Sequence, residues 1–194
     1  MQLITRVKNI LLSPNTEWER IHAETDTPQS LLIKYVIPMA LIPAIAFFIG
    51  YGLIGMDSAV FRTTGIRWAL ILAADSFISS ILTYYICTFV VDALAPSFSS
   101  EKNIGRSAQL VAYSYTAAWV AGIFNILPSL SLLGFLGLYG IYLFYMGMPV
   151  MKKTPEDKRI GYLLISAIVI IVVGLVVNAI ISRIMFGFVG NLSI

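Results

Sequence analysis

Five long apolar stretches, each with few charged residues, constrain this sequence more than any other feature. A helix that crosses a bilayer needs about 20 mainly apolar residues, and each stretch reaches or approaches that length. They cover about residues 31–53, 68–94, 108–126, 130–150 and 161–186. The sequence therefore predicts an all-α fold, a polytopic transmembrane helical bundle with five spans.

The composition indicates that membrane lipid covers much of the surface. Charged residues make up 12% of the chain, whereas a soluble domain carries about 25% because its surface faces water. The net charge of +3 comes from basic residues spread between the apolar stretches. Such placement is typical of cytoplasmic loops beside anionic lipid, and it argues against nucleic acid as a partner.

The positions of lysine and arginine predict the orientation of the chain. Ten of the 13 lie before or at the start of the first stretch, between the second and third, or between the fourth and fifth. The other three are Arg62, Arg67 and Arg183. Because positively charged loops stay in the cytoplasm, we expect a cytoplasmic N-terminus and a C-terminus outside.

Residues 31–194 are predicted to form one membrane domain, which residues 1–30 precede as short amphipathic helices at the cytoplasmic face. The third stretch is the least apolar, and only residues 127–129 separate it from the fourth. Pro128 in this turn resists continuation of the preceding helix. We therefore expect a helical hairpin here rather than one long helix.

The N-terminal segment contains two helical patterns. In residues 3–11 apolar side chains recur at helical spacing, while Arg6 and Lys8 lie off their stripe. This pattern predicts a helix on the inner membrane surface. A serine–proline pair favours the start of a second helix, whose apolar edge is Trp18 and Ile21. An anchoring or packing role is favoured over docking of a partner.

Asp75 is the sharpest polar feature inside a predicted span. It lies about 10 Å below the outer end of the second span at 1.5 Å per residue, and Ser79 and Thr83 follow it at helical spacing. A carboxylate at that depth is costly unless it faces the bundle interior, water or a cation, which indicates an ion, proton or substrate site. The alternative, which we favour, is that the hydroxyls allow close helix contact and Asp75 finds a hydrogen-bond partner.

Other polar residues extend this candidate site. Tyr113, Tyr115 and Asn125 in the third span are placed to line a polar path facing Asp75, although small and hydroxylated residues also serve helix packing. Asp92 stands at the inner end of the second span. A charge costs little at that depth, so we expect Asp92 to be solvated or to cap a helix.

Glycine and proline mark candidate packing sites and kinks. The fourth span carries Gly134, Gly137 and Gly140 in steps of three, which lets another helix approach closely. Pro38 and Pro43 interrupt the first span, and each removes a backbone donor and bends the helix. A static kink is favoured over a cation site at the freed carbonyl groups.

The sequence offers no catalytic, cofactor or metal site. The single histidine, His22, lies outside the predicted spans, and Cys87 is the single cysteine. Neither a nucleophile with a base nor the spacing of a metal site is present, and a glycine-rich phosphate loop with a lysine is lacking. We therefore expect a protein that is not an enzyme.

Three segments resemble a known family. They are ILLSPNTEWERI at 10–21, AYSYTAAWVAGIFNILP at 112–128, and YGIYLFYMGMPVMKKTPEDKRIGY at 139–162. These are similar to bacterial members of the Yip family, whose eukaryotic relatives are the Ypt/Rab-interacting proteins. Bacterial members often have proline near position 117, where this chain has alanine, a difference that affects a helix kink. The resemblance implies five spans in the inner cell membrane, a cytoplasmic N-terminus and a tendency to form homo- or hetero-oligomers.

Three functional hypotheses follow. The first is a non-enzymatic scaffold or adaptor that acts in membrane organisation or complex assembly and self-associates through the small-residue faces of the third and fourth spans. The alternative is a small transporter or channel subunit with Asp75 as its cation- or proton-sensitive group. The third, which the resemblance alone implies, is GTPase docking on the N-terminal helices around Trp18.

Overall fold

The computed structural model describes residues 3–54 and 66–190, and within these ranges the regular elements are all helical. Arg62, one of the basic residues used to predict the orientation, lies outside the described residues. The elements in chain order are α1 (Leu3–Leu12), α2 (Pro14–Ala23), α3 (Pro28–Leu31), the π-helical turn η1 (Leu32–Val36), α4 (Ile37–Ile49), the π-helical turn η2 (Gly50–Ile54), α5 (Ile66–Leu94), the 3-10 turn η3 (Ala95–Phe98), α6 (Ile104–Ser114), α7 (Thr116–Ala121), the 3-10 segments η4 (Gly122–Ile126) and η5 (Pro128–Leu138), α8 (Tyr139–Lys152) and α9 (Glu156–Gly190).

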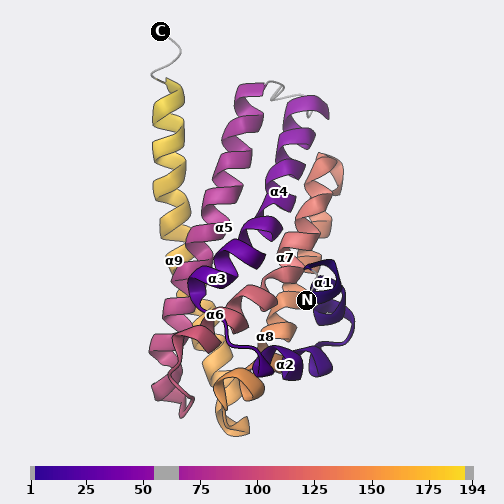
Figure 1. Ribbon diagram of the computed structural model, residues 1–194. Coiled ribbons are helices and arrows are strands. Elements are labelled where there is room, and N and C mark those ends of the chain that lie inside the picture. Colours follow the sequence, from indigo (N-terminus) through magenta and orange to yellow (C-terminus); the bar gives the residue numbers. More distant parts are fainter. Residues whose placement is uncertain (1–2, 55–65, 191–194) are drawn as a thin grey trace.

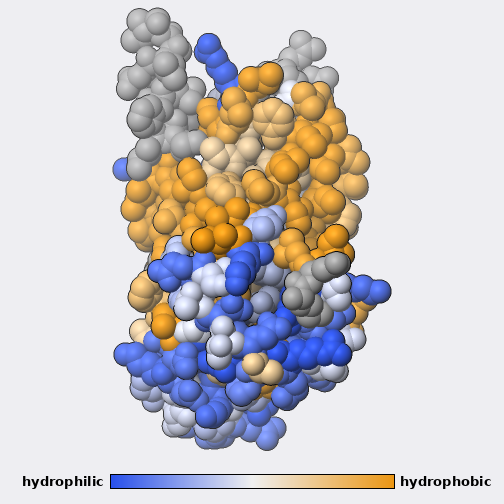
Figure 2. Space-filling view, viewed as in Figure 1, coloured by the Kyte–Doolittle hydropathy of each residue, from blue (hydrophilic) through white to orange (hydrophobic). Residues whose placement is uncertain are grey.

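Four helical segments of the described chain are long and apolar enough to cross a membrane. They are Pro28–Ile54, Ile66–Phe98, Ser129–Lys152 and Glu156–Ile181. Figure 1 shows the corresponding helices side by side along one axis. In Figure 2 the visible face is apolar over these helices and hydrophilic at the end that carries α2. Four of the five predicted spans thus coincide with such segments to within a few residues.

The predicted third span, residues 108–126, has a different construction. It is divided among α6, α7 and η4, with a break at Tyr115, and it is not one of the four segments. Gln109 and Thr116 are almost fully buried, and such polar side chains make the segment less apolar than the others. The described residues therefore contain four segments that are long and apolar enough to cross a membrane, and the fifth crossing stays a proposal.

The prolines of the first span lie where the helix changes geometry. The π-helical turn η1 leads directly into α4, and Pro38 is the second residue of α4. Pro43 is buried inside α4. A Cβ atom added to Gly122 would lie only 2.6 Å from the Cβ atom of Pro43, so this proline packs directly against the backbone of η4.

The two N-terminal helices pack on the bundle through apolar side chains. Ile10 of α1 and Trp18 and Ile21 of α2 are fully buried. The expectation that the stripe of α1 rests on the membrane is therefore wrong in part, since Ile10 faces the protein core and Ile4 is 80% exposed. Arg6, which was expected to lie off the apolar stripe, is buried as well. It pairs with the carboxylates of Glu17 in α2 and of Glu24 at the C-terminal end of α2.

Two of the three glycines in the fourth span allow close contact within the chain. A Cβ atom at Gly137 would lie 3.0 Å from the Cα atom of Ala118, and one at Gly140 would lie 2.6 Å from the carbonyl oxygen of Ser114. A Cβ atom at Gly134 would have no atom within 4 Å. The small-residue faces that we expected to mediate self-association therefore contact each other inside one molecule.

Replacement of Gly140 by alanine is expected to destabilise the bundle by about 1–3 kcal/mol, because the new methyl group forces α6 and α8 apart. Thermal unfolding of the purified protein in one detergent measures this loss. Gly134→Ala is the matched control and is expected to leave the midpoint unchanged or slightly higher. Equal midpoints for the two variants would contradict the close approach.

Candidate functional site

The polar residues predicted to surround Asp75 are dispersed. The Oδ1 atom of Asp75 and the Oγ atom of Ser79, one helical turn further along α5, are buried and find no hydrogen-bond partner among the described residues. Thr83 is half-buried on the same helix. These three positions share a face of α5 but do not form a hydrogen-bonded cluster.

The tyrosines and the asparagine of the third segment lie elsewhere. Tyr113 contacts the ring of Tyr35, with 4.6 Å between centroids, and faces the N-terminal helices. The hydroxyl of Tyr115 lies 3.5 Å from the sulfur of Cys87, about 18 Å along α5 from Asp75 at 1.5 Å per residue. Asn125 donates to the carbonyl oxygen of Gly122. The six residues do not line one path, and the arrangement does not favour the transporter alternative.

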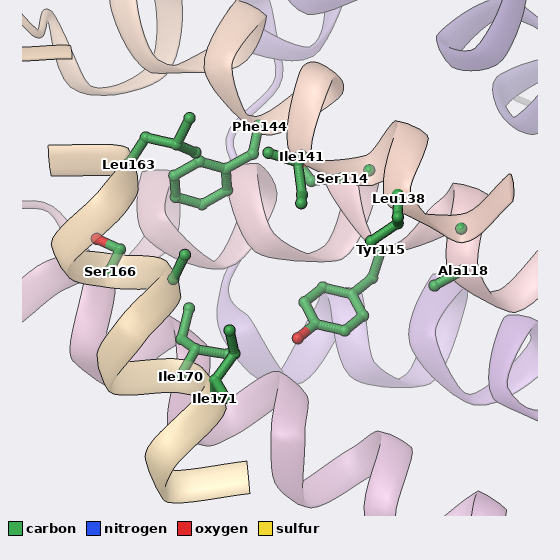
Figure 3. Close-up of a pocket in the computed structure, with 13 residues that line it drawn as sticks. Ser114, Tyr115, Ala118, Leu138, Ile141, Phe144, Leu163, Ser166, Ile170 and Ile171 are labelled. Atoms are coloured by element: carbon green, nitrogen blue, oxygen red, sulfur yellow. The ribbon is translucent and has the colours of Figure 1, made fainter. Parts of the chain in front are cut away.

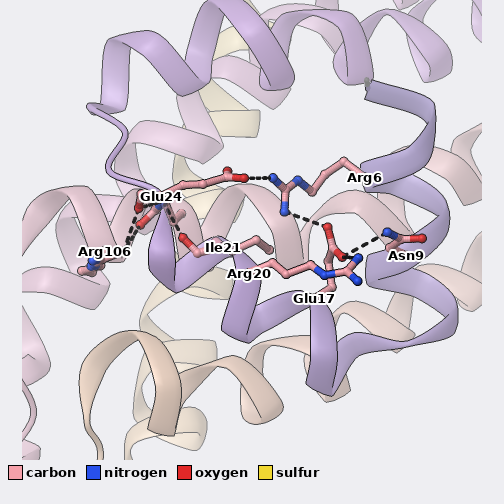
Figure 4. Close-up of polar contacts among 8 residues, drawn as sticks. Arg6, Asn9, Glu17, Arg20, Ile21, Glu24 and Arg106 are labelled. Carbon is pink, nitrogen blue, oxygen red and sulfur yellow. Dashed lines mark hydrogen bonds and ion pairs between the residues drawn. The ribbon is translucent and has the colours of Figure 1, made fainter. Parts of the chain in front are cut away.

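A buried ion-pair network joins α1 to α2 at the hydrophilic end of the molecule (Figure 4). Nη1 of Arg6 donates to Oε1 of Glu17 over 2.7 Å, and Nη2 of Arg6 contacts Glu24. The side chains of Arg6 and Glu17 are 4% and 1% exposed. Asn9 and Arg20 donate to the second oxygen of Glu17. The carboxylate of Glu17 is thus fully engaged, as a buried charge requires.

Charge compensation keeps the guanidinium group of Arg6 protonated. Burial on its own would lower the pKa of Arg6, but the hydrogen bond from Arg6 to Glu24 and the nearby negative charges outweigh it and raise the pKa above its ordinary value. Arg6 also lies 5.4 Å from the ring centre of Tyr113, a distance at which a cation is attracted to an aromatic face. Arg6 therefore connects α1, α2 and α6.

Helix α6 fixes the C-terminal end of α2. Arg106 donates to the carbonyl oxygen of Glu24 over 3.0 Å, and the side-chain amide of Gln109 donates to the carbonyl oxygens of Glu24 and Ile21. The last carbonyl groups of a helix have no partner within the helix. The two side chains satisfy them and hold the N-terminal pair of helices against the membrane domain.

A second buried ion pair connects α5, α6 and α8. Nζ of Lys152 lies 3.2 Å from Oδ1 of Asp92 and 2.6 Å from Oγ of Ser107, and Ser107 donates to the same carboxylate. The side chain of Lys152 is fully buried. The expectation of a solvated or capping Asp92 is therefore wrong, because the inner end of α5 faces two neighbouring helices rather than water.

An apolar groove lies between α7, α8 and α9, with a volume of about 280 Å³. Figure 3 shows Phe144, Ile170 and Tyr115 around the same space. Ser114 and Ser166 also line it, and their buried hydroxyls have no hydrogen-bond partner among the described residues. The groove opens on the membrane-spanning surface, where Leu138 and Ile141 are exposed.

These features define a helical multi-pass membrane protein whose N-terminal helices are locked onto its hydrophilic end. The family model of the Yip1 domain matches residues 8–178. The chain belongs to the Yip1 domain family, which confirms the family resemblance of its sequence. The matched region begins within α1, two residues after Arg6, and ends within α9. It includes the ion pair of Lys152 and Asp92 and the carboxylates that pair with Arg6. No curated protein and no solved structure gives a significant match to the chain.

The ion pair of Lys152 provides a direct stability test. Lys152→Met leaves the Asp92 carboxylate buried without a counter-charge and is expected to lower the free energy of unfolding by about 3–5 kcal/mol. The second change Asp92→Asn is expected to restore much of that loss. Thermal and denaturant unfolding in a single detergent measure both effects.

Lys153→Met is the matched control for this test. The Lys153 side chain is 72% exposed and pairs with Glu101 at the surface, so its loss is expected to cost less than about 1 kcal/mol. If Lys152→Met cost no more than Lys153→Met, the buried pair would not stabilise the fold.

Proposed function

We propose that this protein is a non-enzymatic membrane scaffold that holds a rigid polar surface at the cytoplasmic side for a partner protein. The surface is the outward side of α2, where Asn15, Thr16, Glu19 and Arg20 are exposed. The proposal rests on the Arg6 network. Its buried charges hold α2 in place, which leaves the exposed polar side chains of α2 available to a partner. A surface that is already ordered loses little entropy on binding.

The burial of Trp18 sets a limit on how α2 can bind. Trp18 is fully buried, and a Cβ atom added to Gly147 of α8 would lie 2.7 Å from its ring. Docking of a GTPase through Trp18 would require α2 to leave the bundle. We therefore assign binding to the polar outer face of α2, and not to its apolar edge.

We also propose a fifth crossing, formed by α6, α7 and η4. Arg106 near the start of this segment bonds to Glu24 at the hydrophilic end, whereas Asn125 near its other end packs against Gly50, at the end of α4. The segment thus extends from one end of the first span to the other. Five crossings with the N-terminus in the cytoplasm place the C-terminus outside the cell.

Substituted cysteines test this topology in a Cys87→Ala background. Glu19→Cys, Lys102→Cys and Lys158→Cys are expected to react with a membrane-impermeant maleimide only after the membrane is opened, because these positions lie in the cytoplasm. Ser129→Cys is expected to react in intact cells. Labelling of positions 102 and 129 from the same side of the membrane would contradict the proposed fifth crossing.

A photo-reactive amino acid at Glu19 tests the scaffold. It is expected to give one discrete cross-linked species in cells, and Thr16→Arg, a change one turn away on the same exposed face, is expected to reduce its yield several-fold. The matched control is the same amino acid at Ile168, which is 56% exposed on α9 and faces lipid. A yield at Glu19 that equals the yield at Ile168, or that is unchanged by Thr16→Arg, would contradict a specific partner on α2.

A further inference from the structure

A polar cavity lies between the N-terminal helices and the start of the first span. Its volume is about 400 Å³. The charged residues that line the cavity are Arg6, Glu24, Asp26 and Lys34. It is distinct from the outward face of α2, and it combines both signs of charge with apolar walls.

The charged groups of the cavity differ in how far they are already satisfied. Arg6 is saturated by Glu17 and Glu24. Lys34 is exposed and forms no ion pair or hydrogen bond within the described part of the chain. Asp26 accepts one hydrogen bond, from Ser30 over 3.1 Å, and a carboxylate can accept several more. The cavity therefore offers one unpaired cation, Lys34, and spare acceptor capacity on Asp26 and on the second oxygen of Glu24.

The position of the cavity matches the headgroup level of a bilayer. Lys34 lies near the start of the first membrane-spanning segment, Pro28–Ile54. Further along the same helix, Leu41 and Ile45 are 42% and 53% exposed and one turn apart. In Figure 2 the visible surface changes from hydrophilic to apolar between the end that carries α2 and the membrane-spanning helices. A molecule with its polar end in the cavity could therefore extend its apolar part along α4.

We propose that this cavity binds the headgroup of a phospholipid that carries phosphoethanolamine. Lys34 contacts the phosphate, Asp26 and the free oxygen of Glu24 accept from the primary ammonium group, and the acyl chains lie along Leu41 and Ile45. A net negative headgroup is disfavoured because it would pair with Lys34 and leave the carboxylate of Asp26 without a cation. A quaternary choline is disfavoured because it has no N–H group to donate to them. This binding does not depend on the scaffold function.

Native mass spectrometry of the full-length protein in detergent tests the proposal. The probes are phosphatidylethanolamine, phosphatidylcholine and phosphatidylglycerol with identical acyl chains. Phosphatidylethanolamine is expected to bind about tenfold more tightly than the other two, the difference that one charge-assisted hydrogen bond supplies. Lys34→Gln and Asp26→Asn are each expected to weaken its binding by about tenfold.

Lys8→Gln is the matched control, since Lys8 is an exposed lysine of α1 that does not line the cavity. It is expected to leave the affinity unchanged. Soluble glycerophosphoethanolamine, which has the headgroup without chains, is expected to compete only weakly. The proposal is overturned by equal binding of the three lipids, by tighter binding of phosphatidylglycerol, by equal effects of Lys34→Gln and Lys8→Gln, or by a soluble headgroup that binds as tightly as the lipid.

Discussion

Lys152 and Asp92 lie 60 positions apart in the chain, and their ion pair joins α8 to α5. Its lysine is fully buried and also contacts Ser107 of α6, so three helices share one charge-compensated centre. A buried charge that loses its partner is far more costly than an exposed one, and this centre therefore admits few relative positions of α5, α6 and α8. The N-terminal helix α2 packs against both α6 and α8.

Much of the fold could be predicted because hydrocarbon solvation leaves a strong mark on sequence. Four spans were recognisable from length and apolar content alone. The segment 108–126 was ambiguous for the opposite reason: its surroundings are mostly protein, so it can bury polar side chains such as Gln109. The sequence also could not reveal that Arg6 and Asp92 are buried. Each pairs with residues that only the tertiary arrangement brings near. A hydropathy scale gives a charged residue the same value whether or not it is paired.

The candidate site shows the same division. Asp75 and Ser79 could be recognised as neighbours because helical spacing fixes their common face. The position of Tyr113 beside α1 and α2 could not be predicted, since the break at Tyr115 and the docking of the N-terminal helices determine its surroundings. Membership of the Yip1 domain family accounts for the membrane architecture, while the polar cavity near Lys34 emerges only from the packed structure.

The docking of α2 on α6 has a consequence for biosynthesis. The side-chain amide of Gln109 bonds to the carbonyl oxygen of Glu24, which precedes it by 85 residues. At roughly 5–20 residues per second, the ribosome needs on the order of 4–17 s to deliver that partner. During this delay the newly made N-terminal segment has apolar side chains and no bundle to receive them. An amphipathic helix binds a membrane surface, so the membrane can hold the stripe of α1 until α6 has been synthesised.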